Sequence, residues 1–147
     1  MAIYADTSFI CSCYIQDGNT AAAQSAFATL NQPLVFTAFH RLELRTAFGL
    51  AVFRQRISEA DARLSSKMVI QHLRSGLLVP TRIDWLRAFR DASRLSSTCS
   101  IKFGTRSLDI LHVALARQLS ASMLLTFDKR QADSARSVGL QVLPEGK

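Results

Sequence analysis

AIYADTSFI, residues Ala2–Ile10, joins a short apolar run to the start of a helix through a single acidic residue. Ala2–Ala5 carries no charged side chain, and we predict that it forms a buried strand ending at Asp6. Residues 7–15 are predicted to be helical, with Asp6 or either of the next two residues able to cap the helix. A short apolar strand followed at once by a helix is typical of parallel α/β sheets.

The same alternation continues along the chain. Further short apolar segments predict strands at residues 34–37, 76–80, 123–127 and 140–143. Helices are predicted between them, over residues 18–31, 38–56, 58–76, 84–96, 105–119 and 128–138. We therefore expect an α/β fold, a three-layer α/β/α doubly wound domain with a mainly parallel sheet of four to five strands. We expect residues 1–147 to form one domain.

Length and composition limit the class of protein. A chain of 147 residues with 48% hydrophobic residues can bury one substantial core. It has no apolar run of about 18 residues that could span a bilayer, and no basic segment followed by an apolar one at its start, so we expect a cytoplasmic protein without membrane contact. The three cysteines give no paired framework, and we expect them to be reduced.

The charge balance is strongly basic. Eighteen Lys and Arg residues against eleven Asp and Glu residues give a net charge of +7, and fourteen of the cations are arginines. Arginine suits bidentate contacts with phosphate. The balance favours a polyanionic partner, either a nucleic acid or an acidic protein.

Four acidic residues occupy positions that otherwise belong to the core. Asp6 and Asp128 each follow a predicted strand, and parallel α/β sheets place their sites at the carboxyl ends of strands. Glu43 lies on the apolar side of its predicted helix. Asp109 interrupts the apolar run TRSLDILHVALA, residues 105–116, where it shares one edge with Arg106 and His112.

Buried carboxylates need partners, because an isolated ionised group in an apolar site is costly. Four acids brought together would also repel one another, and a divalent cation such as Mg²⁺ or Mn²⁺ removes both problems. Each acid also has a simpler interpretation. Asp6 and Asp128 can be helix N-caps, Glu43 can pair with an arginine, and Asp109 can interact with the helix dipole.

With these residues assembled, the chain resembles the PIN-domain ribonucleases, and most closely the VapC-type toxins of bacterial toxin–antitoxin pairs. The resemblance covers essentially the whole chain. It rests on four segments in order, each with one acid of the family pattern: YADTSFI with Asp6, LELRTAF with Glu43, DILHVALA with Asp109 and LLTFD with Asp128. Each segment alone is a weak signal, whereas the ordered set is fairly specific.

The resemblance implies a Mg²⁺- or Mn²⁺-dependent endoribonuclease. Asp6, Glu43 and Asp109 would then be the principal metal-binding and catalytic acids, and Asp128 would act directly or through water. Ser8, Thr126 and Arg106 are possible auxiliary residues, the first two by hydrogen bonding and Arg106 by holding a carboxylate or a phosphate. The resemblance also implies an RNA substrate, a homodimer and a cognate antitoxin protein.

Two other functions fit parts of the pattern. A PIN-type domain that no longer cleaves would serve as an RNA-binding or assembly module. An aspartyl-phosphate receiver or phosphatase would also carry an acid after its first strand, but the sequence after Asp6 lacks the second aspartate two residues on that such phosphatases use. Dinucleotide binding is disfavoured, since there is no GxGxxG motif and no P-loop.

Overall fold

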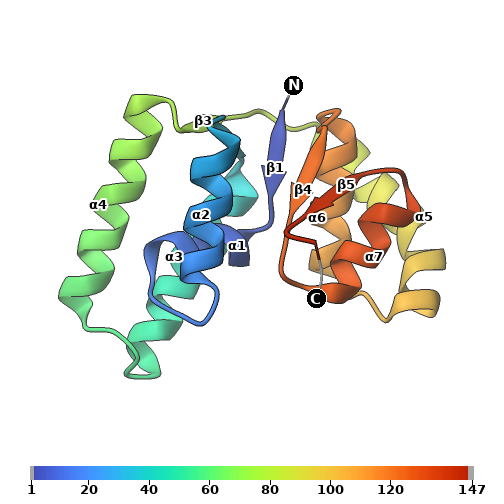
Figure 1. The fold of residues 1–147 in the computed structure, drawn as a ribbon. Coiled ribbons are helices and arrows are strands. Elements are labelled where there is room, and N and C mark those ends of the chain that lie inside the picture. The colour runs from blue at the N-terminus through green and yellow to red at the C-terminus, as the bar shows by residue number, and fades with distance from the viewer. Residues whose placement is uncertain (1, 146–147) are drawn as a thin grey trace. The chain divides into compact units, whose positions relative to one another are not determined.

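The computed structural model describes residues 2–145, in which short strands alternate with longer helices (Figure 1). The chain divides into two compact units. Unit 1 comprises the residues up to Asp6 together with those from Arg82 onward, and unit 2 comprises Thr7–Thr81. The boundary after Asp6 therefore separates the first strand from the helix that follows it.

Unit 1 is built on three parallel strands. Its elements are β1 (Ile3–Ala5), α5 (Trp85–Phe103), α6 (Ser107–Gln118), β4 (Met123–Leu125), α7 (Lys129–Ser137) and β5 (Gln141–Leu143). The central strand β4 pairs with β1 on one side and β5 on the other, so that Leu124 lies between Tyr4 and Val142. Every residue from Ile110 to Ala116 of α6 is buried, as expected for a helix that packs into the core.

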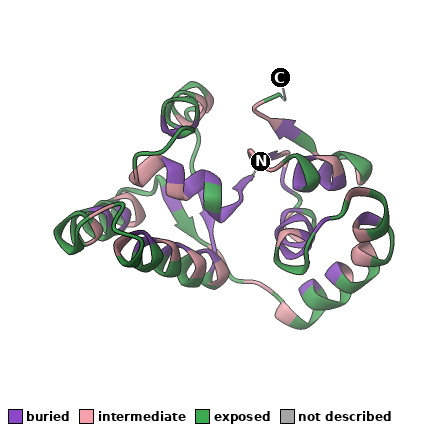
Figure 2. Cartoon of the chain, turned by 90° about the horizontal axis from the view of Figure 1, so that it is seen from below, coloured by how far each residue is buried: buried purple, intermediate pink, exposed green. Residues whose placement is uncertain are grey.

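Unit 2 contains one parallel pair of strands and four helices. Its elements are α1 (Thr7–Tyr14), α2 (Thr20–Leu30), β2 (Leu34–Phe36), α3 (Ala38–Phe53), α4 (Glu59–Ser75) and β3 (Leu78–Pro80). Val35 of β2 is paired in register with Val79 of β3. All of β2 is buried, as is all of β1 in unit 1 (Figure 2).

Helix ends in unit 2 follow local chemistry that is visible in the sequence. Ser58 and Asp61 form a capping box at the start of α4, and Gly76 ends this helix with a φ of 82°. Thr37 caps α3, where the side chain of His40 completes a second capping box. These contacts satisfy backbone N–H groups that the first turn of a helix leaves without intrahelical partners.

The expected α/β class with short strands in parallel pairs is confirmed. All predicted strands and helices are present, with small shifts of their ends in every element except α5. The cysteines are free thiols, as expected. Among residues 2–145, no helix is long and apolar enough to cross a membrane.

Two features differ from the sequence-based expectation. Helix α5 continues to Phe103, seven residues beyond the predicted end. Cys99 in this added segment is buried like Ala88 and Ala92 of the first half, and Gly104 provides the left-handed cap. On α3, the buried face runs through Leu44 and Phe48, whereas Leu42 and Phe53 are exposed. The apolar spacing predicted the helix but not the face that it buries.

Candidate active site

Asp6 and Thr126 meet at the carboxyl ends of two paired strands. Asp6 follows β1, Thr126 follows β4, and the two strands are in register up to Ala5 and Leu125. The hydroxyl of Thr126 donates a hydrogen bond of 2.6 Å to Oδ2 of Asp6, and both residues are buried. The backbone N–H of Asp6 is bound in turn by the carbonyl of Leu125 at 3.0 Å, which continues the strand ladder.

Asp128 is connected to Asp6 through the hydroxyl of Thr126. Its backbone N–H donates to the hydroxyl oxygen of Thr126 at 3.0 Å, so this one hydroxyl contacts both Asp6 and Asp128. Oδ1 of Asp128 accepts from the N–H of Gln131 at 3.0 Å, which makes Asp128 the N-cap of α7. The N-cap interpretation of this acid is therefore correct as a description of its local structure.

Asp109 is connected to Asp128 through Gln131 and lies in the first turn of α6. The carboxamide of Gln131 donates through Nε2 to the backbone carbonyl of Asp109 at 3.0 Å. The Asp109 carboxylate is 24% exposed and accepts from Nε of Arg106 at 3.2 Å. Hydrogen bonds thus connect the three candidate acids that lie in unit 1 in the order Asp6, Thr126, Asp128, Gln131, Asp109.

Asp109 and Asp128 both lie at helix N-termini, where the helix dipole favours negative charge. Asp109 lies in the first turn of α6, and Asp128 precedes the first turn of α7. The exposed N–H groups at these ends carry partial positive charge and stabilise nearby carboxylates. Asp109 therefore lies where the helix dipole favours a carboxylate, and it is also linked to Asp128 through Gln131.

Glu43 lies in unit 2, on α3. The hydroxyl of Thr7, the first residue of α1, donates to Oε1 of Glu43 at 2.7 Å. Thr7 follows Asp6 directly in the sequence. Ser8 is the second residue of α1 and has an exposed side chain.

The oxygen donors of unit 1 fit a hard divalent cation in kind. They are the carboxylates of Asp6, Asp109 and Asp128, without cysteine sulfur, and such a set suits Mg²⁺ or Mn²⁺. Within residues 2–145, neither unit by itself brings three His, Cys, Asp or Glu side chains into a metal-holding group. A further carboxylate or several waters would therefore be needed to complete a coordination shell around these acids.

Three polar contacts of histidine and glutamine side chains were not expected from the sequence, and one of them, between Tyr4 and His112, is fully buried. The hydroxyl of Tyr4 is bonded to Nδ1 of His112 at 2.7 Å, and that of Tyr14 to Nδ1 of His72 at 2.5 Å. The third contact is the one between Gln131 and Asp109. The sequence gives one indication of a role for Gln131, because the segment Asp128–Gln131, DKRQ, has the spacing of a capping box.

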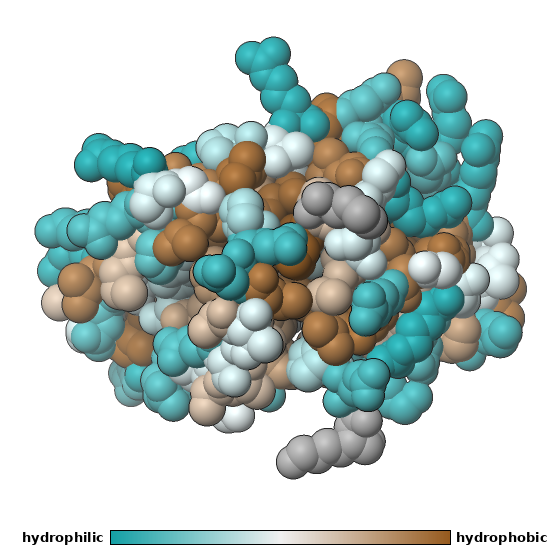
Figure 3. All heavy atoms as spheres, turned by 45° about the horizontal axis from the view of Figure 1, so that its top comes forward, coloured by the Kyte–Doolittle hydropathy of each residue, from teal (hydrophilic) through white to brown (hydrophobic). Residues whose placement is uncertain are grey.

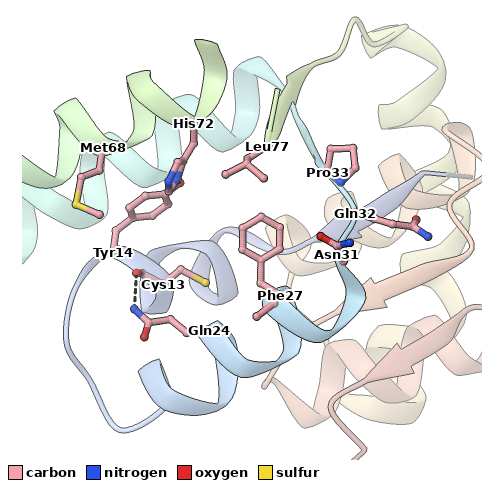
Figure 4. A pocket seen from close by; sticks show the side chains of 11 residues that line it. Cys13, Tyr14, Gln24, Phe27, Asn31, Gln32, Pro33, Met68, His72 and Leu77 are labelled. Carbon is pink, nitrogen blue, oxygen red and sulfur yellow. Dashed lines mark hydrogen bonds between the residues drawn. The ribbon is translucent and has the colours of Figure 1, made fainter. Parts of the chain in front are cut away.

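Unit 2 also contains a pocket of about 330 Å³ between α1, α2 and α4 (Figure 4). Its wall includes the Tyr14–His72 pair, and burial raises the pKa of Tyr14 well above its usual value, with the nearby Cys13 adding to the shift. Its other lining residues are Cys13, Gln24, Phe27, Ala28, Asn31, Gln32, Pro33, Met68 and Leu77. The lining holds no carboxylate, lysine or arginine, so this pocket does not provide the groups that phosphate chemistry requires.

Arginine and lysine side chains extend from the surface, and Figure 3 shows such long hydrophilic residues with hydrophobic ones between them. Close to the acids of unit 1 these cations are Arg106, Lys129 and Arg130, which flank Asp109 and Asp128 in the sequence. Arg106 is 75% exposed and Lys129 is 87% exposed. In the structure Arg106 contacts Asp109, whereas Lys129 pairs with Asp133 of its own helix.

The chain is similar to known proteins in sequence and in fold. No family model matches the chain. The chain is 27% identical to Ribonuclease VapC46 of Mycobacterium tuberculosis (strain ATCC 25618 / H37Rv) over 145 residues, which cover 97% of this chain and 96% of that protein. The structure of the present chain superimposes on the crystal structure of FitAcB from Neisseria gonorrhoeae with a TM-score of 0.63. The two chains are 16% identical, and the match covers 97% of this chain and 96% of the other.

The fold is PIN-like. This confirms the fold class that the sequence predicts, and the similarity to a VapC ribonuclease over nearly the full length confirms the resemblance. In the structure Asp6 follows β1, Asp109 lies in the first turn of α6 and Asp128 precedes α7.

Proposed function

We propose that this protein is a Mg²⁺- or Mn²⁺-dependent endoribonuclease that acts as the toxin of a toxin–antitoxin pair. The observation that carries the proposal is the hydrogen-bonded chain from Asp6 through Thr126, Asp128 and Gln131 to Asp109 in unit 1. The similarity to Ribonuclease VapC46 over 97% of the chain supports the choice of RNA hydrolysis among the reactions that such acids can serve.

In this proposal Asp6, Glu43, Asp109 and Asp128 are the acids that hold the metal. A bound Mg²⁺ or Mn²⁺ supplies Lewis acidity to a phosphate oxygen and lowers the pKa of a coordinated water. Thr126 holds Asp6 in one orientation through its 2.6 Å bond, and Thr7 does the same for Glu43 through its 2.7 Å bond. Fixed ligands reduce the reorganisation that catalysis would otherwise require.

Arg106 has two roles in the proposal. In the structure it neutralises Asp109 at 3.2 Å from an exposed position. Its guanidinium has five donors, and the same side chain can also contact the phosphate of an RNA strand. Ser8 is proposed to hydrogen bond to a ligand or a bound water.

The partner proposals rest on the family resemblance and on exposed apolar side chains of unit 2. Six large apolar residues of α3 and α4 are at least 40% exposed: Leu42, Leu50, Phe53, Leu64, Met68 and Ile70. Such surface is typical of a protein interface. We propose a homodimer that uses these helices and a cognate antitoxin that blocks the acids. Light scattering of the antitoxin-free protein at micromolar concentration tests the dimer, and a monomer would contradict it.

The test of the nuclease proposal is cleavage of total RNA by purified, antitoxin-free protein. Reactions contain Mn²⁺ or Mg²⁺ and about 150 mM salt, which suppresses nonspecific binding of RNA to a +7 protein. Parallel reactions contain EDTA, or the variants Asp6→Asn and Asp109→Asn.

Asp91→Asn is the matched control. Asp91 is 26% exposed and paired with arginines of its own helix α5, as Asp109 is 24% exposed and paired with Arg106. Discrete fragments that require metal, disappear in Asp6→Asn and Asp109→Asn and persist in Asp91→Asn support the nuclease. Fragments that persist in all variants indicate a contaminant. Binding of RNA without any cleavage favours a non-catalytic RNA-binding module.

A further inference from the structure

Gln131 contacts two of the proposed metal-binding acids of unit 1, Asp128 and Asp109, as Thr126 contacts Asp6 and Asp128. Its backbone N–H donates to Oδ1 of Asp128, and its Nε2 donates to the carbonyl of Asp109. It is the third residue of α7, and Asp109 is the third residue of α6. The side chain therefore links the first turns of the two helices on which Asp109 and Asp128 depend for their positions.

The burial of this side chain is costly for the fold. Gln131 is fully buried, and its Oε1 has no hydrogen-bond partner among residues 2–145. A buried carbonyl oxygen without a partner destabilises a protein, and an apolar side chain of the same shape avoids that cost. The bond from Nε2 to the carbonyl of Asp109 is the contact that an amide makes here and an apolar side chain cannot make.

We propose that Gln131 is a positioning residue for the metal site, which sets the separation of Asp109 and Asp128 and thereby the affinity of the acids for a divalent cation. This inference rests on the proposed function. Groups that orient metal ligands typically contribute about 10- to 100-fold in metal affinity. Gln131 reaches Asp109 through the backbone rather than the carboxylate, so it acts on the helix turn that presents the acid.

The test replaces Gln131 by methionine, which has nearly the same shape but no hydrogen-bond donor. Mn²⁺ binding is measured by calorimetry and by electron paramagnetic resonance, and the melting temperature of the metal-free protein is measured in parallel. We expect Gln131→Met to weaken Mn²⁺ binding by about 10-fold or more, with an unchanged or higher melting temperature. RNA cleavage at saturating RNA should fall in parallel and recover partly at high Mn²⁺.

Gln118→Met is the matched control. Gln118 lies on the same helix as Asp109, and its amide also joins α6 to another helix start, donating to the carbonyl of Asp84 at 3.0 Å and accepting from its N–H at 3.1 Å. Both ends of this amide are used, so we expect Gln118→Met to lower the melting temperature and to leave Mn²⁺ affinity unchanged. Gln131→Met should thus change Mn²⁺ affinity without lowering the melting temperature, and Gln118→Met should lower the melting temperature without changing Mn²⁺ affinity.

The outcomes separate this inference from the proposed function. Normal Mn²⁺ affinity in Gln131→Met, with a lowered melting temperature, overturns the positioning role and leaves the nuclease intact. Absence of Mn²⁺ binding and of cleavage in the unmodified protein overturns both proposals. Gln131→Leu is the second variant, and if neither variant folds, Gln131 serves stability and the inference is wrong.

Discussion

Thr126 donates a 2.6 Å hydrogen bond to Oδ2 of Asp6, and the two residues follow the paired strands β4 and β1. The register of this pair, with Ala5 opposite Leu125, makes the contact possible because the residue after each strand emerges at the same edge. One threonine hydroxyl thereby orients the buried acid and accepts from the N–H of Asp128. The position of Asp6 relative to Thr126 therefore depends on the pairing of β1 with β4.

Replacing Thr126 by valine keeps the shape of the side chain and removes its hydroxyl. Because Asp6 and Thr126 are 4% and 2% exposed, the carboxylate would lose a donor that solvent does not readily replace. We expect a loss of roughly 1–3 kcal/mol in the free energy of unfolding and a fall of about 10- to 100-fold in metal-dependent cleavage. Urea unfolding and RNA cleavage measure the two effects. Thr126→Ser retains the hydroxyl and should behave like the unmodified protein, and equal cleavage by all three proteins would contradict the prediction.

Arg106→Gln separates the structural and functional roles of the Arg106–Asp109 pair. Arg106 is 75% exposed, and exposed pairs contribute about 0–1 kcal/mol, so the free energy of unfolding should hardly change. If Arg106 contacts a phosphate, the slope of log K for RNA against log salt should decrease in magnitude by about one unit. Fluorescence titrations at several salt concentrations give this slope. An unchanged slope would remove Arg106 from the RNA interface.

The capping box of α4 makes stability depend on pH through Asp61. Hydrogen bonds from the backbone and side chain of Ser58 lower the pKa of Asp61 below its usual value. The stabilisation is therefore fully present above the unfolded-state pKa of about 4 and is lost as pH falls through the lower folded-state pKa. Asp61→Asn should reduce the loss of stability between pH 7 and pH 3, as measured by urea unfolding. A steeper loss in the variant would reverse the predicted sign.

Ser58→Ala tests the other half of the same capping box. Its hydroxyl oxygen accepts from the N–H of Asp61 at 3.0 Å, and the loss of such a cap typically costs about 0.5–2 kcal/mol. Because Ser58 is not among the proposed metal-binding acids or their hydrogen-bond partners, the variant should retain its Mn²⁺ affinity when folded. Urea unfolding and Mn²⁺ titration measure the two quantities, and a stability equal to that of the unmodified protein would show that the cap is dispensable.

Cys11 and Cys13 should react slowly with alkylating reagents in the folded protein. Burial, followed by the negative charge of Asp17, raises the pKa of each thiol to about 11. Because the thiolate is the reactive form, iodoacetamide at pH 8 should label both about 100-fold more slowly than in urea. Mass spectrometry of labelled peptides measures the rates. The same shift predicts that stability falls as pH rises from about 9 to 11, because the unfolded chain releases these protons first.

The elements of the fold were predictable because each has a local signal. AIYA and LLTF are short apolar runs, and Ser58 with Asp61 has the spacing of a capping box. The serine-rich end of α5 was cut short in the prediction, since serine has a modest helix propensity and the burial of Cys99 in this segment is a tertiary contact. The exposure of Leu42 and Phe53 was not predictable, because apolar spacing alone does not define the face that packs.

The acids themselves were predictable from their positions after strands and within an apolar helix. Arg106 was expected to hold a carboxylate or a phosphate, and it contacts the Asp109 carboxylate, whereas the hydroxyl that contacts Asp6 was not identified. Nothing in the sequence indicates that Thr126 contacts Asp6, 120 residues away, or that Tyr4 contacts His112. Gln131 has a sequence signal only as a capping residue. Its contact with Asp109 depends on how α7 packs beside α6.

By itself, the amino-acid sequence determined the α/β class, the order of strands and helices, the helix caps and the four acidic positions. These features arise from interactions between residues a few positions apart, such as apolar periodicity and the bonds of Ser58 and Asp61. Only the tertiary structure decided which hydroxyl orients Asp6 and which amide joins Asp109 to α7. Those contacts cross long stretches of chain, and they exist only after strand register and helix packing have brought the groups within hydrogen-bonding distance.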